Sequence, residues 1–178
     1  MRHDSLWIKD KGWTSVRDYI IEVPDFPIEG ISFKDVSPLL ADADIFSGVI
    51  ENMGKLLSKL PDCWIGIEAR GFLFASALAY KYGGGIVMCR KAGKLPPPVV
   101  RKRYQLEYGT EWIEMKEGNG IAIIVDDVLA SGGTLQATNQ LSKTTGYDVI
   151  DNLVLIDLQY VPRVEDFNLE VKSLIQYE

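Results

Sequence analysis

A short apolar segment of this sequence ends in two acidic residues and a loop of small residues. Residues 121–125 read Ile-Ala-Ile-Ile-Val and are followed by Asp126 and Asp127. An uninterrupted apolar run of this length is typical of a strand that is buried on both faces. Residues 130–134 then read Ala-Ser-Gly-Gly-Thr, and a helix is expected over Leu135–Lys143. Ligands of parallel sheets bind outside the carboxyl ends of the strands, so this junction is a candidate site.

The loop has the composition of an anion site. Glycines allow positive φ and close backbone approach, so the N–H groups of residues 130–134 can face one anion. The helix that follows adds the partial positive charge of its N-terminus. Carboxylates repel phosphate but bind sugar hydroxyls, so the pattern predicts a ligand such as a ribose 5-phosphate. The alternative is an ordinary strand-end turn, as in phosphoacceptor domains. A Walker loop is excluded because no Lys follows the glycines.

A second junction of this kind, residues 67–71, places Arg70 between an expected strand and an expected helix. A guanidinium group in this position can bind a second phosphate through two parallel hydrogen bonds. The alternative is a surface ion pair between Arg70 and Glu68.

A basic run with Arg90, Lys91 and Lys94 begins where the expected strand 86–89 ends. These cations therefore point toward the same edge of the sheet as Arg70. In an acidic protein, a local group of cations attracts a polyanionic substrate. The alternative is a solvated basic surface.

The elements around these junctions alternate between strands and helices. Strands are expected at 28–33, 63–67, 86–89, 121–125 and within 149–158, and helices at 14–21 with Thr14 as N-cap, 44–60, 72–82 and 135–143. A β-hairpin is expected over 101–115, with Gly109 and Thr110 between its arms. This order predicts an α/β fold with a mainly parallel sheet flanked by helices on both faces.

Composition narrows the classes of function. A length of 178 residues with 47% hydrophobic content predicts a single domain over 1–178. The net charge of −6 argues against nucleic-acid binding, and no apolar run reaches the roughly 18 residues that span a bilayer. Cys63 and Cys89 are expected to be buried and reduced, which favours the cytoplasm. The single histidine, His3, lies near the chain end, which argues against a Ser-His-Asp hydrolase or a His-ligated metal.

Residues 125–134 resemble the 5-phosphoribosyl 1-pyrophosphate signature of the type I phosphoribosyltransferases. Three further segments make the chain similar to the adenine phosphoribosyltransferase family: Pro24–Pro38, Arg90–Pro96 and Leu106–Gly109. The resemblance implies the type I fold, a flexible hairpin lid over 100–117, and an N-terminal hood with a base-recognition segment over 1–35. The departures are an N-terminal extension with Trp7 and Trp13, three prolines at 96–98, and a short link over 116–120.

The resemblance implies a purine salvage enzyme. Such an enzyme transfers the phosphoribosyl group of 5-phosphoribosyl 1-pyrophosphate to adenine, giving AMP and pyrophosphate, and it acts as a homodimer. It uses Mg²⁺ held mainly by the substrate and water, with no direct protein ligand. Ala130 departs from the hypoxanthine–guanine enzymes, which carry Asp there, but orotate and some xanthine enzymes also have Ala. Another base (xanthine, hypoxanthine or orotate), or a non-catalytic nucleotide-binding regulator of the same fold, therefore remains an alternative.

The resemblance also implies a role for each site residue and a cis peptide between Glu68 and Ala69. The catalytic residues would be Glu107, as the acid/base, and Arg70. The phosphoribosyl group would bind Asp126, Asp127, Ala130, Ser131, Gly132, Gly133 and Thr134. Pyrophosphate would bind Glu68, Ala69, Arg70, Arg90, Lys91, Lys94 and Tyr108. Adenine would be read by main-chain groups of Ser32 and Lys34 and sandwiched between Phe33 and Val128.

Overall fold

The computed structural model describes residues 4–8, 12–106 and 109–178, so His3 lies outside the described residues. The chain forms two compact units, Met1–Asn52 and Met53–Glu178. The expectation of one domain over the whole chain stays a prediction. None of the helices in the described ranges combines the length and apolar character needed to cross a membrane.

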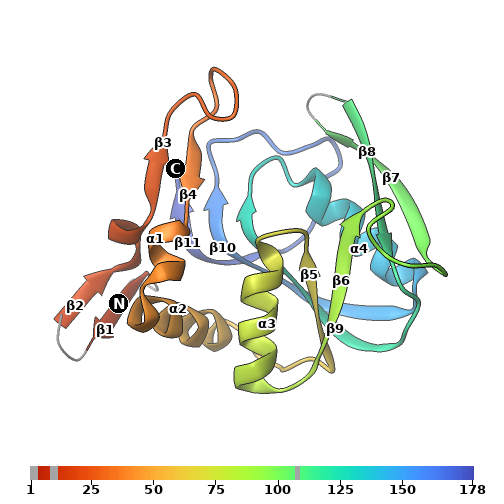
Figure 1. Ribbon diagram of the computed structural model, residues 1–178, viewed down its shortest axis with the longest axis horizontal. Helices are drawn as coiled ribbons and strands as arrows, with labels where there is room; N and C mark the ends of the chain where they lie inside the picture. The colour runs from red at the N-terminus through yellow and green to blue at the C-terminus, as the bar shows by residue number, and fades with distance from the viewer. Residues whose placement is uncertain (1–3, 9–11, 107–108) are drawn as a thin grey trace. The chain divides into compact units, whose positions relative to one another are not determined.

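The first unit consists of two short antiparallel strand pairs and three helical segments; its labelled elements can be followed in Figure 1. Its elements are β1 (Ser5–Ile8), β2 (Gly12–Ser15), the 3-10 helix η1 (Val16–Tyr19), β3 (Ile21–Val23), β4 (Phe33–Asp35), α1 (Ser37–Ala41) and α2 (Ala43–Lys55), which continues into the second unit. Trp7 and Trp13 face each other across the β1–β2 hairpin, with ring centroids 5.7 Å apart. Both rings are more than half exposed.

Two predictions for the first unit are wrong. The helix expected over 14–21 is a strand followed by η1, and Ser15 is the N-cap, because its Oγ accepts the Arg17 N–H at 3.3 Å. The strand expected over 28–33 begins only at Phe33. The preceding residues form a turn closed by a hydrogen bond from Phe26 N to Ile31 O at 3.1 Å.

Helix α2 confirms the predicted apolar period, since Ile45, Val49, Ile50 and Met53 are all buried. The helix ends at Lys55 rather than at Leu60. The N–H groups of Leu56 and Leu57 bond three residues back, which closes the helix with tight turns.

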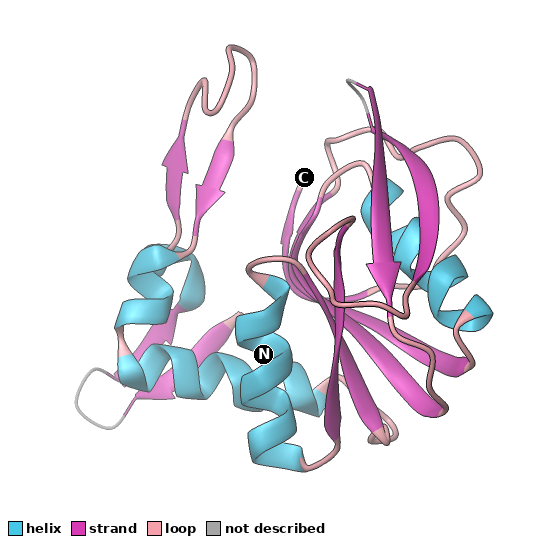
Figure 2. Cartoon of the chain, turned by 45° about the vertical axis from the view of Figure 1, so that its right-hand side comes forward, coloured by secondary structure: helices cyan, strands magenta, loops and turns pink. Residues whose placement is uncertain are grey.

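The second unit contains a seven-stranded sheet with the order β11-β10-β9-β5-β6-β8-β7 (Figures 1 and 2). Its elements are β5 (Cys63–Ile67), α3 (Gly71–Tyr82), β6 (Gly85–Lys91), β7 (Val100–Leu106), β8 (Gly109–Met115), β9 (Gly120–Leu129), α4 (Gly133–Thr144), β10 (Tyr147–Leu158) and β11 (Lys172–Tyr177). The five strands from β11 to β6 are parallel, and the β7–β8 hairpin joins β6 in antiparallel pairing. The mainly parallel α/β sheet is thus confirmed.

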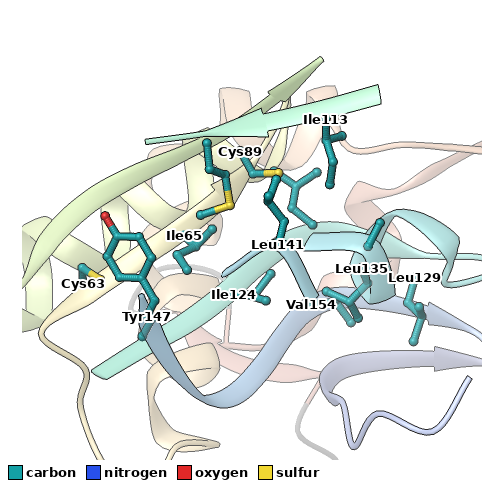
Figure 3. Close-up of a cluster of buried hydrophobic side chains, with 14 residues drawn as sticks. Cys63, Ile65, Cys89, Ile113, Ile124, Leu129, Leu135, Leu141, Tyr147 and Val154 are labelled. Atoms are coloured by element: carbon teal, nitrogen blue, oxygen red, sulfur yellow. The ribbon is translucent and has the colours of Figure 1, made fainter. Parts of the chain in front are cut away.

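Helices α3 and α4 cover opposite faces of this sheet (Figure 2). On the α3 face, a Cβ at Gly66 would lie 2.9 Å from the Phe72 ring, so only glycine lets the helix approach so closely. On the α4 face, alternate strand residues form a buried core with Leu135 and Leu141 (Figure 3). Cys63 and Cys89 belong to this core and are free and buried, as predicted.

Several boundaries in the second unit differ from expectation. Strand β6 does not end at Cys89 but continues through Arg90 and Lys91, because these two residues pair with Glu114 and Ile113 of β8. Strand β9 continues through Asp126 and Asp127 to Leu129, because Asp126 pairs with Val154 and Val128 with Ile156 in β10. In the hairpin, Gly109 and Thr110 are the first residues of β8 rather than the turn between the arms.

Candidate active site

The loop between β9 and α4 has the geometry of an anion site. Gly132 has φ +85° and ψ −3°, in the left-handed region, and a Cβ there would lie 2.5 Å from Cε2 of Phe167. Gly132 O accepts the Gln136 N–H at 2.9 Å, which starts the helix directly after the loop. Among the described residues, the backbone N–H groups of Ser131–Thr134 have no acceptor. The first turn of a helix leaves such donors for a ligand.

A pocket opens at this loop on the carboxyl side of β9. Residues of β9, the loop, the start of α4 and one residue of β10 form its wall: Asp126, Val128, Leu129, Ala130, Ser131, Gly132, Gly133, Thr134, Leu135 and Val154. All the residues predicted to bind the phosphoribosyl group line it except Asp127. Val128, predicted to contact adenine, lines it as well.

Arg163 holds this loop in place, which was not predicted from the sequence. Its guanidinium donates to the carbonyl oxygen of Ala130 and pairs with Asp157 at the end of β10. The guanidinium carbon also lies 5.9 Å from the centre of the Phe167 ring. Arg163 and Ala130 are 33 positions apart, and no local pattern in the sequence signals their contact.

Asp126 and Asp127 are less exposed than strand-end carboxylates were expected to be. Asp127 is 5% exposed, and Asp126 is half-buried and accepts the Asp127 N–H at 2.9 Å. Burial, together with repulsion from Asp127, raises the pKa of Asp126 well above its ordinary value. Burial also raises the pKa of Asp127, although Arg70 opposes that shift. A cationic ligand, or positive charge that develops on a sugar, would favour the ionised pair.

The second junction lies beside these carboxylates. Arg70 pairs with Asp127, with Nε 2.7 Å from Oδ2. A Cβ at Gly71 would lie 2.7 Å from the Val125 carbonyl oxygen and 3.0 Å from Oδ1 of Asp126, so α3 starts directly against β9. The predicted cis peptide between Glu68 and Ala69 is confirmed.

A second pocket contains two of the predicted basic residues, Arg90 and Lys91, whereas Arg70 and Lys94 are not among its lining residues. It is lined by Ile67, Glu68, Cys89, Arg90, Lys91, Tyr104, Glu111, Ile113 and Thr134. Thr134 lines both pockets, so the phosphate loop and the cationic pocket are neighbours.

Carboxylates hold the cations of the second pocket. Glu68 Oε1 accepts from Nη2 of Arg90 at 2.7 Å, and Oε2 accepts the Lys91 N–H at 2.9 Å. The Arg90 hydrogen bond is the main reason that the pKa of Glu68 is lowered. Lys91 Nζ lies 2.9 Å from Oε1 of Glu111, and the Tyr104 hydroxyl lies 3.3 Å from Oε2 of the same residue. Tyr104 and Glu111 were not predicted as site residues. They lie on the same face of the hairpin as Lys102 and Ile113, because they are two residues away from them along each strand.

The remaining predicted residues fall elsewhere. Glu107 and Tyr108 lie outside the described residues. Ser32, Phe33 and Lys34 belong to the first unit, whereas Val128 belongs to the second, so their joint role stays a prediction.

Within the first unit, Glu22 holds the predicted base-recognition segment. The Lys34 ammonium pairs with Glu22 at 2.9 Å, and the Ser32 hydroxyl donates to the same carboxylate. These hydrogen bonds and the lysine charge lower the pKa of Glu22. Phe33 packs edge-to-face on Phe26, with ring centroids 5.2 Å apart.

Comparison with known proteins agrees with this geometry. The phosphoribosyl transferase domain family matches residues 36–167. The adenine phosphoribosyltransferase of Rhodospirillum rubrum is 44% identical over 169 residues, which cover 92% of this chain and 99% of the relative.

Solved structures of adenine phosphoribosyltransferases are similar to this chain in fold as well. The adenine phosphoribosyltransferase of Thermoanaerobacter pseudethanolicus is 39% identical with a TM-score of 0.83, and the match covers 91% of this chain and 98% of that one. The Saccharomyces cerevisiae enzyme, solved with an imino-altritol bisphosphate and adenine, is 31% identical with a TM-score of 0.81, over 89% and 96% of the two chains. This agreement in sequence, coverage and fold shows that the chain belongs to the adenine phosphoribosyltransferase family.

Proposed function

We propose that this protein transfers the 5-phosphoribosyl group of 5-phosphoribosyl 1-pyrophosphate to adenine, a purine salvage reaction that gives AMP and pyrophosphate. The observation that carries the proposal is the pair of neighbouring pockets that share Thr134. One pocket presents free loop amides beside the Asp126 carboxylate, and the other presents Arg90 and Lys91. A ribose with a phosphate at one end and a pyrophosphate at the other matches both. The names of the relatives support adenine as the acceptor.

The reaction breaks the bond between the anomeric carbon and the pyrophosphate oxygen and forms a bond to a ring nitrogen of adenine. Asp126 and Asp127 bind the ribose hydroxyls and stabilise the positive charge that develops at the anomeric carbon. Arg70, Arg90, Lys91 and Lys94 stabilise the negative charge on the leaving pyrophosphate. Glu68 holds Arg90 in place rather than contacting phosphate, because two anions would repel each other.

The proton of the reacting nitrogen needs an acceptor. Glu107 is assigned this task from the sequence resemblance, and Tyr108 is assigned to close the site over pyrophosphate.

Main-chain groups of Ser32 and Lys34 are assigned the recognition of the base edge. An N–H and a C=O there match the acceptor and amino-donor edge of adenine. The pairing of Glu22 with both side chains supports a fixed main chain at this segment.

We assign Mg²⁺ as the cofactor. The ion would be held mainly by phosphate oxygens of the donor and by water, because Mg²⁺ usually keeps several waters and binds substrate phosphates. Asp126 and Asp127 would add negative charge at the ribose end of the site. Bound with the donor, the ion would neutralise pyrophosphate charge and make it a better leaving group.

A substrate panel tests the proposal. Adenine, hypoxanthine, guanine, xanthine and orotate are each supplied with 5-phosphoribosyl 1-pyrophosphate and Mg²⁺, and nucleotide formation is measured. We expect a strong preference for adenine, because a site matched to an amino group leaves partners unpaired when a 6-oxo base enters. Turnover of hypoxanthine comparable to that of adenine would contradict the assignment, and nucleotide binding without any turnover would favour a regulator.

We propose that the protein is a homodimer. Ile86 and Met88 of β6 and Trp112 of β8 are 48%, 44% and 49% exposed. They share one sheet face, because Arg90 pairs with Glu114 in the β6–β8 register. Exposed apolar side chains on one face are typical of an association surface. Sedimentation should give twice the 19.9 kDa chain mass, and Met88→Asp should give monomers. Monomers of the wild-type chain at micromolar concentration would refute this.

We also place the protein in the cytoplasm. The free, buried Cys63 and Cys89 support a reducing compartment, where thiols persist.

A further inference from the structure

Glu114 is a fully buried carboxylate on the hairpin strand β8, and it is surrounded by donors. Its exposed fraction is 0%. Oε1 accepts the backbone N–H groups of Lys94 and Leu95 at 2.8 Å and 2.7 Å, and Oε2 accepts from Nε of Arg101 at 2.9 Å. The strand register places Arg90, Glu114 and Arg101 side by side across β6, β8 and β7. A carboxylate at this position therefore binds a loop and two strands together.

The carboxylate stays ionised in spite of its burial. Burial favours the neutral acid, but hydrogen bonds from the amides of Gly93, Leu95 and Lys94 and from Arg101 outweigh it and lower the pKa of Glu114 to about 2. Hydrogen bonds to an ionised group are shorter and stronger than neutral ones. The contacts of Glu114 are thus charge-assisted throughout the neutral pH range.

These contacts fix the segment that carries the cations of the second pocket. Arg90 donates through Nη1 to the Lys94 carbonyl oxygen at 3.1 Å and through Nη2 to Glu68 at 2.7 Å. The Lys94 N–H in turn donates to Glu114. A continuous series of hydrogen bonds therefore runs from Glu68 through Arg90 and Lys94 to Glu114. A shift of the Lys94–Leu95 backbone would move the carbonyl that orients Arg90.

We propose that Glu114 is a positioning residue that holds the Arg90–Lys94 segment where its cations meet the pyrophosphate of the donor. This inference rests on the proposed function, because that function supplies the pyrophosphate. Glu114 itself contacts no substrate. It acts through the backbone of Lys94 and Leu95, so its loss should weaken the binding of pyrophosphate and leave the base side of the reaction intact.

The test replaces Glu114 by Gln, which has nearly the same shape but no charge. Glu117→Gln is the matched control: it removes the same charge from an exposed side chain three residues further along. Binding of inorganic pyrophosphate with Mg²⁺ is measured by calorimetry, and KM is measured separately for donor and for adenine. Hydrogen exchange of the Lys94 and Leu95 amides reports whether the segment is released.

In Glu114→Gln we expect the Kd for pyrophosphate and the KM for donor to rise about 10- to 100-fold, the effect of losing one charge-assisted bond. The KM for adenine should stay within about threefold, and the two amides should lose protection. Glu117→Gln should behave as the wild type. Arg101→Gln should change the same quantities in the same direction but less, because Arg101 is exposed and the two amides remain bonded to Glu114.

A folded Glu114→Gln variant with unprotected amides and unchanged pyrophosphate affinity would overturn the proposal, because Glu114 would then be only structural. If that variant does not fold, Arg101→Gln decides, and unchanged pyrophosphate affinity in it overturns the proposal. Failure of the proposed function gives a different result: the wild type makes no AMP from adenine, yet its pyrophosphate affinity still depends on Glu114.

Discussion

Substitution of Gly132 by Ala tests whether the loop before α4 binds the phosphate of the donor. An L-residue in the left-handed region costs about 1–2 kcal/mol. The new Cβ would also lie 2.5 Å from Phe167, and overpacking of this kind costs about 1–3 kcal/mol. The sum of about 2–5 kcal/mol is large against a typical stability of about 5–15 kcal/mol, so we expect the loop to change conformation rather than retain the strain.

A changed loop would alter how the free N–H groups of Ser131–Thr134 are presented to a phosphate. Each lost hydrogen bond to a charged phosphate is worth about 1.5–3 kcal/mol, so affinity for ribose 5-phosphate should fall at least about tenfold. Calorimetry measures this affinity, and thermal unfolding on the same sample measures stability.

Two control variants separate the causes. Gly30 has φ +88°, and no atom lies within 4 Å of the place that a Cβ would take, so Gly30→Ala carries the backbone cost without a clash. It should lose stability and keep its affinity for ribose 5-phosphate. Adding Phe167→Ala to Gly132→Ala removes the clash and should restore part of the affinity. Wild-type affinity in a folded Gly132→Ala variant would refute the phosphate role of the loop.

Asp127→Asn should lower turnover by about 10²- to 10³-fold. It should leave the unfolding free energy at neutral pH unchanged or higher, because burial raises the pKa of Asp127 and the fold disfavours its charge. Turnover and melting temperature of one sample check this, and a melting loss with full turnover would contradict it. Acid stability should depend on Glu114: its folded pKa of about 2 lies below its ordinary 4.5, so its contribution is present above pH 4.5 and is lost toward pH 2. Unfolding of wild type and Glu114→Gln across this range measures the difference, which should be flat above about pH 5. Glu107→Gln should lower kcat by about 10²- to 10⁴-fold with little change in donor binding, and a normal kcat at every pH would remove Glu107 as the acid/base.

The second unit could be predicted well because its signals are local. An uninterrupted apolar run such as Cys63–Ile67 is most stable as a strand that is covered on both faces, and the structure has a fully buried strand there. The glycines at 132 and 133 likewise identify the loop, since Gly132 needs positive φ. The carboxylates, the loop and the start of the helix were therefore located by residue type alone.

The first unit was predicted poorly because its short strands are stabilised by pairing with a neighbouring strand and have no distinctive hydrophobic pattern in the sequence. Strand β4 is three residues long and exists through pairing with β3, in which Phe33 lies opposite Val23. The preceding residues are apolar enough to suggest a strand but close a turn. The extent of β9 was missed for the same reason, because Asp126 and Asp127 continue it only through pairing with β10.

The ion-pair partners of the charged site residues could not be predicted from the sequence either. These partners determine how the cations of the site are oriented. Arg70 pairs with Asp127, Arg90 with Glu68 and Lys91 with Glu111. The members of each pair are far apart in the sequence, so only the fold reveals it. The pairs hold the cations in fixed orientations before the donor arrives, which reduces the entropy lost on binding.

Under the proposed function, the same pairs mean that pyrophosphate enters a site whose positive charge is already balanced. Lys91 has a side chain 60% exposed, so exchange of Glu111 for a phosphate oxygen there costs little desolvation. Asp127 is buried against Arg70, and that pair opens less readily. Under the proposed function, the ribose hydroxyls would bind Asp127 without breaking its pair with Arg70. A pyrophosphate oxygen would replace Glu111 as the partner of Lys91. A ligand that carries both groups would make both contacts, so this pairing of the cations would favour the intact donor over free phosphate.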